Sequence, residues 1–127
     1  MVDTQGTVLR VSVHPADVTD CRGAPLVFQK LSRTHFDRLN YFWADRAYRG
    51  WLVRWVLLNL KATLHIVARP DGAPIWMKLP RRWVIERTFA WLGRYRRLSK
   101  DYEQLPVVSE AFVYIASIRR LVRLYTR

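Results

Sequence analysis

Cysteine, glycine and long apolar runs are scarce in this chain, and each shortage excludes a class of protein. The single cysteine, Cys21, excludes an intramolecular disulfide framework and a cysteine-based zinc site. The three histidines lack metal-ligand spacing, and the sequence contains neither a glycine-rich phosphate loop nor a Gly-x-Ser-x-Gly motif. Nucleotide-binding and acyl-transfer enzymes are therefore disfavoured.

Signals for secretion or membrane insertion are missing as well. No charged and then apolar leader follows Met1, and the longest apolar stretch, around residues 55–60, is far too short to cross a bilayer. From these observations we expect a soluble protein of a reducing cytoplasm, with no membrane partner.

Acidic side chains are outnumbered by basic ones. The chain has 22 basic and 10 acidic residues, a net charge of +12, and residues 78–127 alone carry 12 basic and 4 acidic residues. Arginine outnumbers lysine 18 to 4, which suits bidentate phosphate contacts but equally fits a bias in the base composition of the source genome. A nucleic acid is the predicted partner, with a merely solvated basic surface as the alternative.

The 127 residues, half of them apolar, suit a single domain of α/β class. Residues 1–68 predict alternating strands and helices, residues 69–80 predict a loop rich in proline, and residues 81–127 predict two helices. In chain order we expect a strand at 7–14, a helix at 22–32 capped by Thr19 or Asp20, a strand at 40–44, a largely buried helix at 49–60, a strand at 62–68, and helices at 83–98 and 107–125.

Asp45 directly follows the short aromatic strand predicted at residues 40–44. Active sites in open α/β sheets gather beyond the carboxyl ends of strands, so this carboxylate is placed for chemistry. An equally supported interpretation makes Asp45 a helix N-cap or a salt-bridge partner of Arg46 or Arg49. The residues alone leave both interpretations open.

Glu86 is the only acidic residue between Lys78 and Lys100, a stretch with eight lysines or arginines. Helical spacing predicts a stripe that contains Arg82, Glu86, Ala90, Gly93 and Arg97, where small residues let a bulky group such as a phosphate approach the carboxylate. The alternative is a solvated pair between Glu86 and Arg82, worth only about 0.2–0.5 kcal/mol. The opposite face is predicted to pack on the core, and its members are Val84, Ile85, Thr88, Phe89, Trp91, Leu92, Tyr95 and Leu98.

The last predicted helix has an apolar face and a basic side. Its apolar face is formed by Val108, Ala111, Ile115, Ile118 and Val122, and its basic side by Arg119, Arg120, Arg123 and Arg127. We expect the apolar face to dock on the core. The arginines either contact DNA or complement the helix dipole.

An Asp after a strand and a Glu on a later helix, inside a basic surface, suggest a metal site for phosphoryl transfer. Divalent ions held by carboxylate oxygens activate an attacking oxygen and stabilise a leaving oxygen, while basic residues hold the strands. This pattern fits chemistry on DNA.

Several segments resemble the C-terminal part of DDE transposases from bacterial insertion sequences. The segments are residues 2–6, 14–18, 44–50, 83–92, 94–98 and 100–103, so the resemblance covers nearly the whole chain. It implies a partial RNase H-like fold with a short mixed sheet flanked by helices and two C-terminal helices. It also implies Mg²⁺ or Mn²⁺ as the cofactor and double-stranded DNA, both element ends and target, as the partner.

The same resemblance assigns individual residues. Asp45 would be the second catalytic and metal-binding carboxylate and Glu86 the third. The DNA-binding residues would be Arg82, Arg87, Arg94, Arg96, Arg97 and Lys100. The sequence departs from the wider family at Leu79, where a tyrosine is expected, and at Gly93, where a lysine is expected and Arg94 follows.

The family's first catalytic aspartate lies upstream of the segment that begins here at Val2, and Asp3 is expected on a neighbouring strand instead. We therefore expect a C-terminal fragment of a transposase whose complete form cleaves DNA and transfers strands. An upstream reading-frame product or a full-length transposase would be its protein partner, and the sequence leaves the oligomeric state open. Such a fragment would lie in the cytoplasm, associated with the nucleoid. The alternatives are a catalytically inactive DNA-binding regulator of transposition and a basic structural protein bound to RNA.

Overall fold

A computed structural model describes residues 1–31, 38–77, 79 and 81–126. The chain divides into two compact units, one formed by Ala16–Trp83 and the other by Met1–Pro15 together with Val84–Arg127. Across the described residues the helices are too short or too polar to cross a membrane. Ser32 of the predicted helix, Lys78 and Pro80 of the predicted loop, His35, and Arg127 of the predicted basic side lie outside the described residues.

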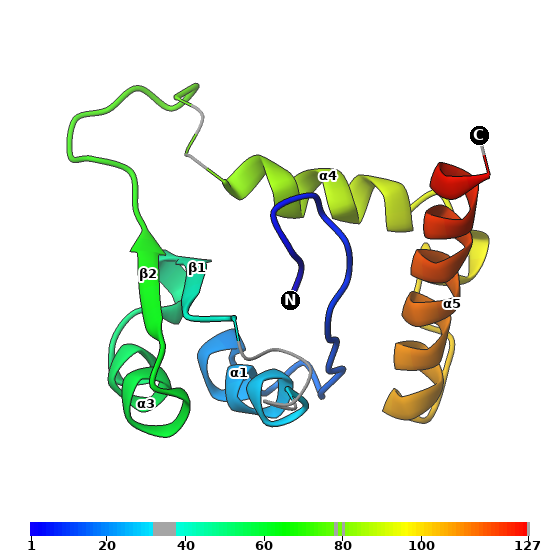
Figure 1. Ribbon diagram of the computed structural model, residues 1–127, viewed down its shortest axis with the longest axis horizontal. Helices are drawn as coiled ribbons and strands as arrows, with labels where there is room; N and C mark the ends of the chain where they lie inside the picture. Colours follow the sequence, from blue (N-terminus) through cyan, green and yellow to red (C-terminus); the bar gives the residue numbers. More distant parts are fainter. Residues whose placement is uncertain (32–37, 78, 80, 127) are drawn as a thin grey trace. The chain divides into compact units, whose positions relative to one another are not determined.

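The unit formed by Ala16–Trp83 is built on a parallel pair of strands, which Figure 1 shows side by side. Strand β1 (Tyr41–Asp45) pairs with β2 (Thr63–Val67), so that Tyr41 faces Thr63 and Asp45 faces Val67. Parallel strands require a crossover, which is supplied by α3 (Trp51–Leu60) after the short 3-10 helix η1 (Arg46–Tyr48). The strands predicted at residues 40–44 and 62–68 are confirmed to within one residue at each end.

One face of this sheet is buried. Phe42 of β1 and Leu64 of β2 are 9% and 5% exposed, and Phe28 of helix α1 (Asp20–Gln29) meets Phe42 edge to face at 5.1 Å. Alternate strand residues point to opposite faces, so Tyr41, Trp43 and Asp45 lie together on the exposed side. The core therefore fixes which way Asp45 points.

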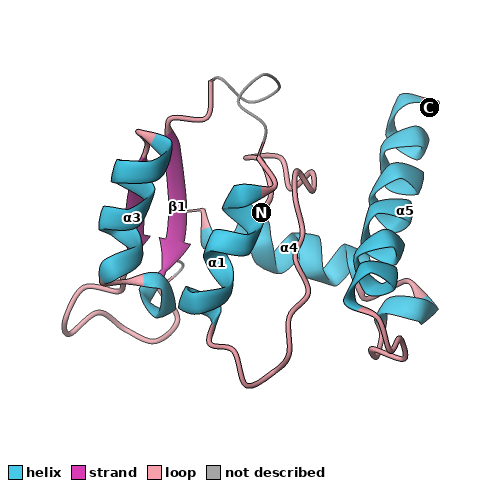
Figure 2. Cartoon of the chain, turned by 90° about the horizontal axis from the view of Figure 1, so that it is seen from below, coloured by secondary structure: helices cyan, strands magenta, loops and turns pink. Residues whose placement is uncertain are grey.

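Two helices of this unit differ in detail from the prediction. Helix α1 begins at Asp20 after Thr19, which is the N-cap residue although its side chain makes no capping hydrogen bond. Helix α3 was expected to be largely buried, but only Leu52 and Val56 are buried, while Leu57 and Leu58 are more than half exposed. A sheet of two short strands covers only one stripe of a helix (Figure 2), so the rest of α3 faces outward.

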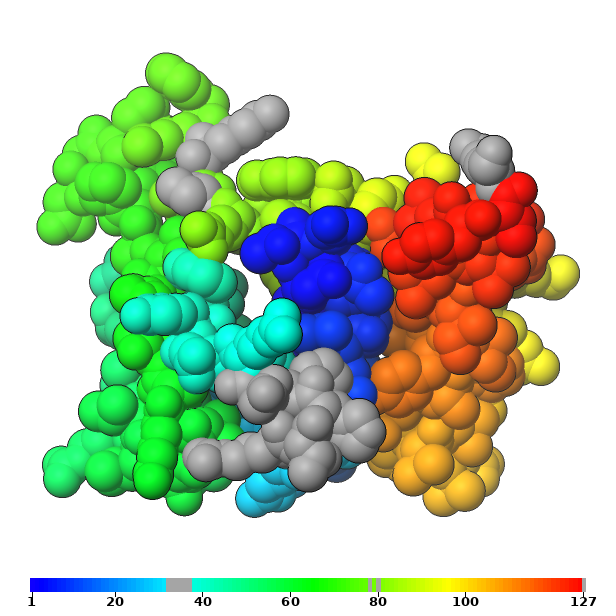
Figure 3. Space-filling model, viewed as in Figure 1, coloured from blue at the N-terminus to red at the C-terminus, as the bar shows by residue number. Residues whose placement is uncertain are grey.

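The prediction of a strand at residues 7–14 is wrong. This segment runs along α5 (Pro106–Tyr125), and Figure 3 shows the N-terminal segment directly against that helix. The Val11 N–H donates to the Tyr114 hydroxyl at 3.1 Å, and the Val13 N–H donates to Glu110 Oε1 at 2.9 Å. Side chains of α5 thus take the donors that a neighbouring strand would need. The sheet of the described residues is accordingly parallel rather than mixed.

Helix α4 (Arg82–Leu92) ends six residues earlier than predicted, and a 3-10 turn, η2 (Arg96–Leu98), follows Gly93. Glycine is a poor residue for a helix interior, which explains the stop. Val84 and Thr88 of the predicted apolar face are buried, but Ile85 and Phe89 are 40% and 69% exposed. The predicted face is therefore only partly correct.

The buried face of α5 is also different from the predicted one. Small residues, Ser109, Ala116 and Ser117, are buried, whereas Ile115, Ile118 and Val122 are 54–59% exposed. The large indole of Trp91 lines the same small cavity as Ala116 and Ser117. Packing volume rather than hydropathy thus selects the contact face, because only small side chains leave room for that ring.

Gly6 joins the N-terminal segment to α4 by close packing. Its carbonyl accepts a hydrogen bond from the Thr88 hydroxyl at 3.1 Å. A Cβ at Gly6 would lie 2.6 Å from Thr88 Oγ1 and 3.1 Å from Trp91, and the backbone φ is +83°. The position therefore requires glycine for both its conformation and its lack of a side chain.

We predict that Gly6→Ala destabilises the protein more than Gly72→Ala. Gly72 has a similar φ of +78° with nothing within 4 Å of an added Cβ, so it matches the backbone strain without the clash. Both changes cost about 1–2 kcal/mol for the conformation, and Gly6→Ala adds about 1–3 kcal/mol for overpacking. Denaturant unfolding of the two variants measures the difference. Equal midpoints would contradict the close contact at Gly6.

Candidate functional site

Asp45 is the last residue of β1, and its side chain is exposed. The carboxylate Oδ1 accepts a hydrogen bond from the Ala47 N–H at 2.9 Å and thereby caps η1. The interpretation of Asp45 as an N-cap is confirmed. It is compatible with the interpretation that places the carboxylate for chemistry. A capping carboxylate is held in one orientation at the carboxyl end of a parallel strand, where α/β proteins place their active sites.

Tyr48 and Cys21 lie in the same unit as Asp45, and the carboxylate of Asp45 and the thiol of Cys21 both act on the Tyr48 phenol. Burial raises the pKa of the Tyr48 phenol, and the negative charges of Asp20 and Asp45 raise it further. The Cys21 thiol is half-buried and points to the Arg49 carbonyl, with the sulfur 3.9 Å from the oxygen. A neutral phenol therefore lies near Asp45 at ordinary pH.

Glu86 lies in α4, and its side chain is exposed together with Ala90 and Gly93. The predicted stripe is confirmed for Arg82, Glu86 and Ala90, but Gly93 and Arg97 lie beyond the end of α4. The pairing of Glu86 with Arg82, which the sequence offered as the alternative, stays a prediction. Asp45 and Glu86 belong to different units of the chain.

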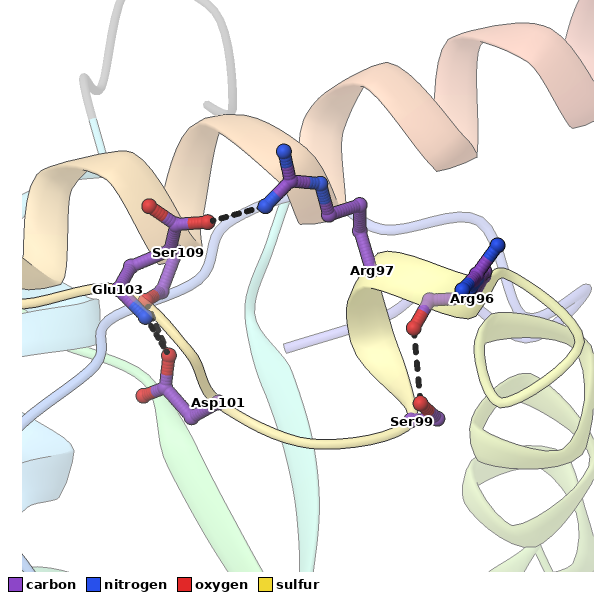
Figure 4. Close-up of polar contacts among 6 residues, drawn as sticks. All are labelled: Arg96, Arg97, Ser99, Asp101, Glu103 and Ser109. Carbon is purple, nitrogen blue, oxygen red and sulfur yellow. Dashed lines mark hydrogen bonds and ion pairs between the residues drawn. The ribbon is translucent and has the colours of Figure 1, made fainter.

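Four of the predicted DNA-binding residues have exposed side chains. Arg82 lies on the first turn of α4, and Arg94, Arg96 and Lys100 follow the end of that helix. The segment after α4 is fixed by polar contacts of its own (Figure 4). The Ser99 hydroxyl donates to the Arg96 carbonyl at 2.8 Å, and the Ser109 hydroxyl donates to Asp101 Oδ1 at 2.8 Å.

The other predicted DNA-binding residues have contacts inside the protein. Arg87 donates to the Gln5 carbonyl at 2.9 Å and lies over the Trp91 ring at 4.7 Å. Arg97 pairs with Glu103 at 3.3 Å, although its side chain is still 66% exposed. Arg87 therefore acts first as a structural residue.

Arg120 is a cation that the sequence placed on the outward side of α5 and that the structure places inward. Its guanidinium carbon lies 3.5 Å from the centre of the Trp91 ring. Burial and the neighbouring Arg87 lower the pKa of Arg120, while Asp3 and Tyr95 act in the opposite direction. Both Arg87 and Arg120 thus make cation–π contacts with Trp91, an arrangement that helix spacing alone does not reveal.

The carboxylates of Asp45 and Glu86 are of the right type for Mg²⁺ or Mn²⁺, which prefer hard oxygen ligands. Both side chains are exposed and therefore accessible to an ion. Within the described part of the chain, no group of three or more His, Cys, Asp or Glu side chains could hold a metal. Ligand type fits such an ion, and an octahedral site requires donors beyond these two side chains.

An aromatic row on the exposed face of the sheet was missed by the sequence analysis. Tyr41 and His65 stack with ring centres 5.8 Å apart, and Trp43 and His65 stack at 6.1 Å. Arg81 lies over the Trp43 ring at 3.7 Å. The alternation of Tyr41 and Trp43 along β1 was the available signal. Their partner His65 belongs to β2, which lies next to β1 in the sheet but far from it in the sequence.

Comparison with known proteins gives a family and one relative. Residues 1–121 match the family described as transposase DDE domain. A Brucella ovis protein, named as a transposase for insertion sequence element IS6501, is 30% identical over 121 residues. The match covers 91% of this chain and 89% of that protein, so the two are of similar length. No solved structure matches the chain.

We predict that Tyr48 contributes a loss of stability at alkaline pH. The unfolded chain ionises this phenol near its ordinary pKa of about 10, whereas the folded chain keeps it neutral because its pKa is raised. The unfolded state therefore releases its proton first, and stability falls as pH rises above that value. Unfolding midpoints of wild type and Tyr48→Phe, measured from pH 8 to 11, should diverge from about pH 10.

Tyr125→Phe is the control for this experiment, because it removes a hydroxyl from an exposed ring at the end of α5. A Tyr48→Phe profile that parallels wild type throughout would refute the assigned environment of the phenol.

Proposed function

The chain belongs to the transposase DDE domain family, and we propose that it acts as an insertion-sequence transposase through Asp45 and Glu86. The observation that carries the proposal is the position of Asp45, exposed at the carboxyl end of a parallel strand in a chain of this family. The strand–helix–strand unit is compatible with part of an RNase H-like fold, and we infer that fold for the complete enzyme.

Each carboxylate has a distinct structural support for this role. Asp45 is oriented by its bond from the Ala47 N–H, so its charge is held in place without an added ion. Glu86 projects from a helix next to Ala90, which leaves the approach to it uncrowded. Asp45 and Glu86 would hold Mg²⁺ or Mn²⁺, which supplies Lewis-acid activation of a phosphodiester when bound.

DNA would be held by the outward cations. Arg94, Arg96 and Lys100 lie close together in the sequence and present exposed charges beyond the end of α4. Arg82 and Arg97 extend this set, whereas Arg87 orders the N-terminal segment and supports the surface from within. Phosphates of element ends and target DNA are the expected ligands.

A non-catalytic regulator that binds element ends is the competing function. In that case the chain would join a full-length transposase or an upstream reading-frame product that supplies the first carboxylate. Cleavage and binding must therefore be measured separately.

We predict that Asp45→Asn and Glu86→Gln each abolish excision of the element. Both variants remove a charge with almost no change of shape, and Asn can still accept the capping hydrogen bond from Ala47. A donor plasmid that carries the reading frame with its native flanking DNA keeps any upstream segment available. Excision should fall at least about a hundredfold, which is the scale of losing one group that stabilises charge in a transition state.

Asp71→Asn is the matched control, since Asp71 is an exposed aspartate in the loop after β2. It should excise like wild type. Unchanged excision by Asp45→Asn or Glu86→Gln would show that the carboxylate assignment is wrong. A wild-type chain that binds element ends but never supports excision would identify the regulator instead.

We predict that replacing Arg94, Arg96 and Lys100 together by glutamine reduces the salt dependence of DNA binding. Each lost phosphate contact lowers the slope of log affinity against log salt by about 0.9, so the triple variant should lose up to about 2.7. Fluorescence anisotropy with a duplex at several salt concentrations gives the slope. This triple variant removes three positive charges from the chain.

The control triple replaces Arg22, Arg54 and Lys61 by glutamine, because these exposed residues give the same change in net charge elsewhere. Its slope should stay close to wild type. Equal losses in both triples would mean that net charge, rather than the surface around Arg94, determines binding.

A further inference from the structure

The exposed face of the sheet carries a continuous row of flat groups. In order they are Arg81, Trp43, His65 and Tyr41, joined by distances of 3.7, 6.1 and 5.8 Å between guanidinium carbon or ring centres. The planes of neighbouring rings differ by only 17° and 21°. Tyr41 is 58% exposed and Trp43 42% exposed, so the row is accessible at its Tyr41 end.

Aromatic pairs across strands also stabilise sheets, but that role alone explains the row poorly. The core of this unit lies on the other face, where Phe42 and Leu64 pack with Phe28. Large aromatic groups normally contribute stability by burying about 150–250 Å² each. Tyr41 and Trp43 leave about half of their surface to solvent, so about half of this contribution is not used within the unit.

The charge around the row indicates the kind of molecule that would cover it. Residues 16–83 carry 12 basic and 5 acidic side chains, a net charge of +7. Arg81 already adds a cation to one end of the row. A flat aromatic ligand attached to negative charge is complementary to both features, and an unpaired nucleotide of a DNA strand has this chemistry.

We propose that Tyr41, Trp43 and His65 form a stacking platform for an unpaired DNA base beside Asp45. Trp43 and Asp45 are alternate residues of β1 and so project on the same face, about 6.5 Å apart along the strand. The ring face of a base is available for stacking only outside the duplex, so the ligand is a single-stranded or flipped nucleotide. The platform rests on the proposed function, because it requires a chain that binds DNA.

The test uses the full chain and a short single-stranded DNA that contains 2-aminopurine, whose fluorescence is quenched when it stacks. Wild type should quench the probe. Tyr41→Thr, which keeps a residue suited to a strand, should weaken binding about 5- to 150-fold and remove the quenching, as expected for loss of one stacked base. Tyr41→Phe keeps the ring and should behave like wild type.

Tyr125→Thr is the control, because it removes an even more exposed tyrosine, 87% against 58% for Tyr41, from a site outside the platform. Circular dichroism and the unfolding midpoint establish that each variant is folded. Folded Tyr41→Thr with unchanged quenching, or Tyr125→Thr with an equal loss, would overturn the platform.

A second measurement separates this inference from the proposed function. The same strand annealed to its complement should bind Tyr41→Thr as tightly as wild type, within about twofold, since its bases are paired. Duplex binding without single-strand quenching in wild type would reject the platform and leave the transposase proposal intact. Failure of wild type to bind either form would reject both.

Discussion

The parallel register of β1 and β2 is the constraint on which the candidate site depends. Asp45 is opposite Val67, and alternate residues of β1 face opposite sides of the sheet. A slip of one residue would turn Asp45 toward the core and Phe42 toward solvent. The packing of Phe28 and Leu64 on the core side opposes that slip, so apolar contacts on one face determine the direction of a carboxylate on the other.

The second unit is held together by polar contacts between segments far apart in the sequence. The Thr88 hydroxyl donates to the Gly6 carbonyl, and the Arg87 guanidinium donates to the carbonyl of Gln5. On the other side of the segment, Tyr114 and Glu110 accept from Val11 and Val13. The N-terminal segment pairs with itself only at the isolated Val2–Val8 bridge. Its other contacts come from two helices, and those with Arg87 and Thr88 also fix α4, which carries Glu86.

The strands of the sheet were predictable because their signal is local. β1 is a short aromatic run and β2 is rich in β-branched residues, and both features can be read directly from the sequence. Residues 7–14 show the same β-branched character, yet their partners are side chains 97 and 103 positions away, which no local pattern encodes. The prediction of the buried face of α5 failed for a similar reason, because the volume of Trp91 rather than hydropathy determines which residues of α5 are buried.

The sequence singles out the carboxylates of the candidate site more clearly than its cations. Asp45 and Glu86 stand out by their settings in the sequence and by family resemblance, and their roles stay predictions. Arginines have no such signal, because a guanidinium serves equally well against a phosphate or an indole. Arg81, Arg87 and Arg120 all lie over tryptophan rings. Net charge therefore overstates the number of cations free for DNA, and the affinity should follow the few that extend into solvent.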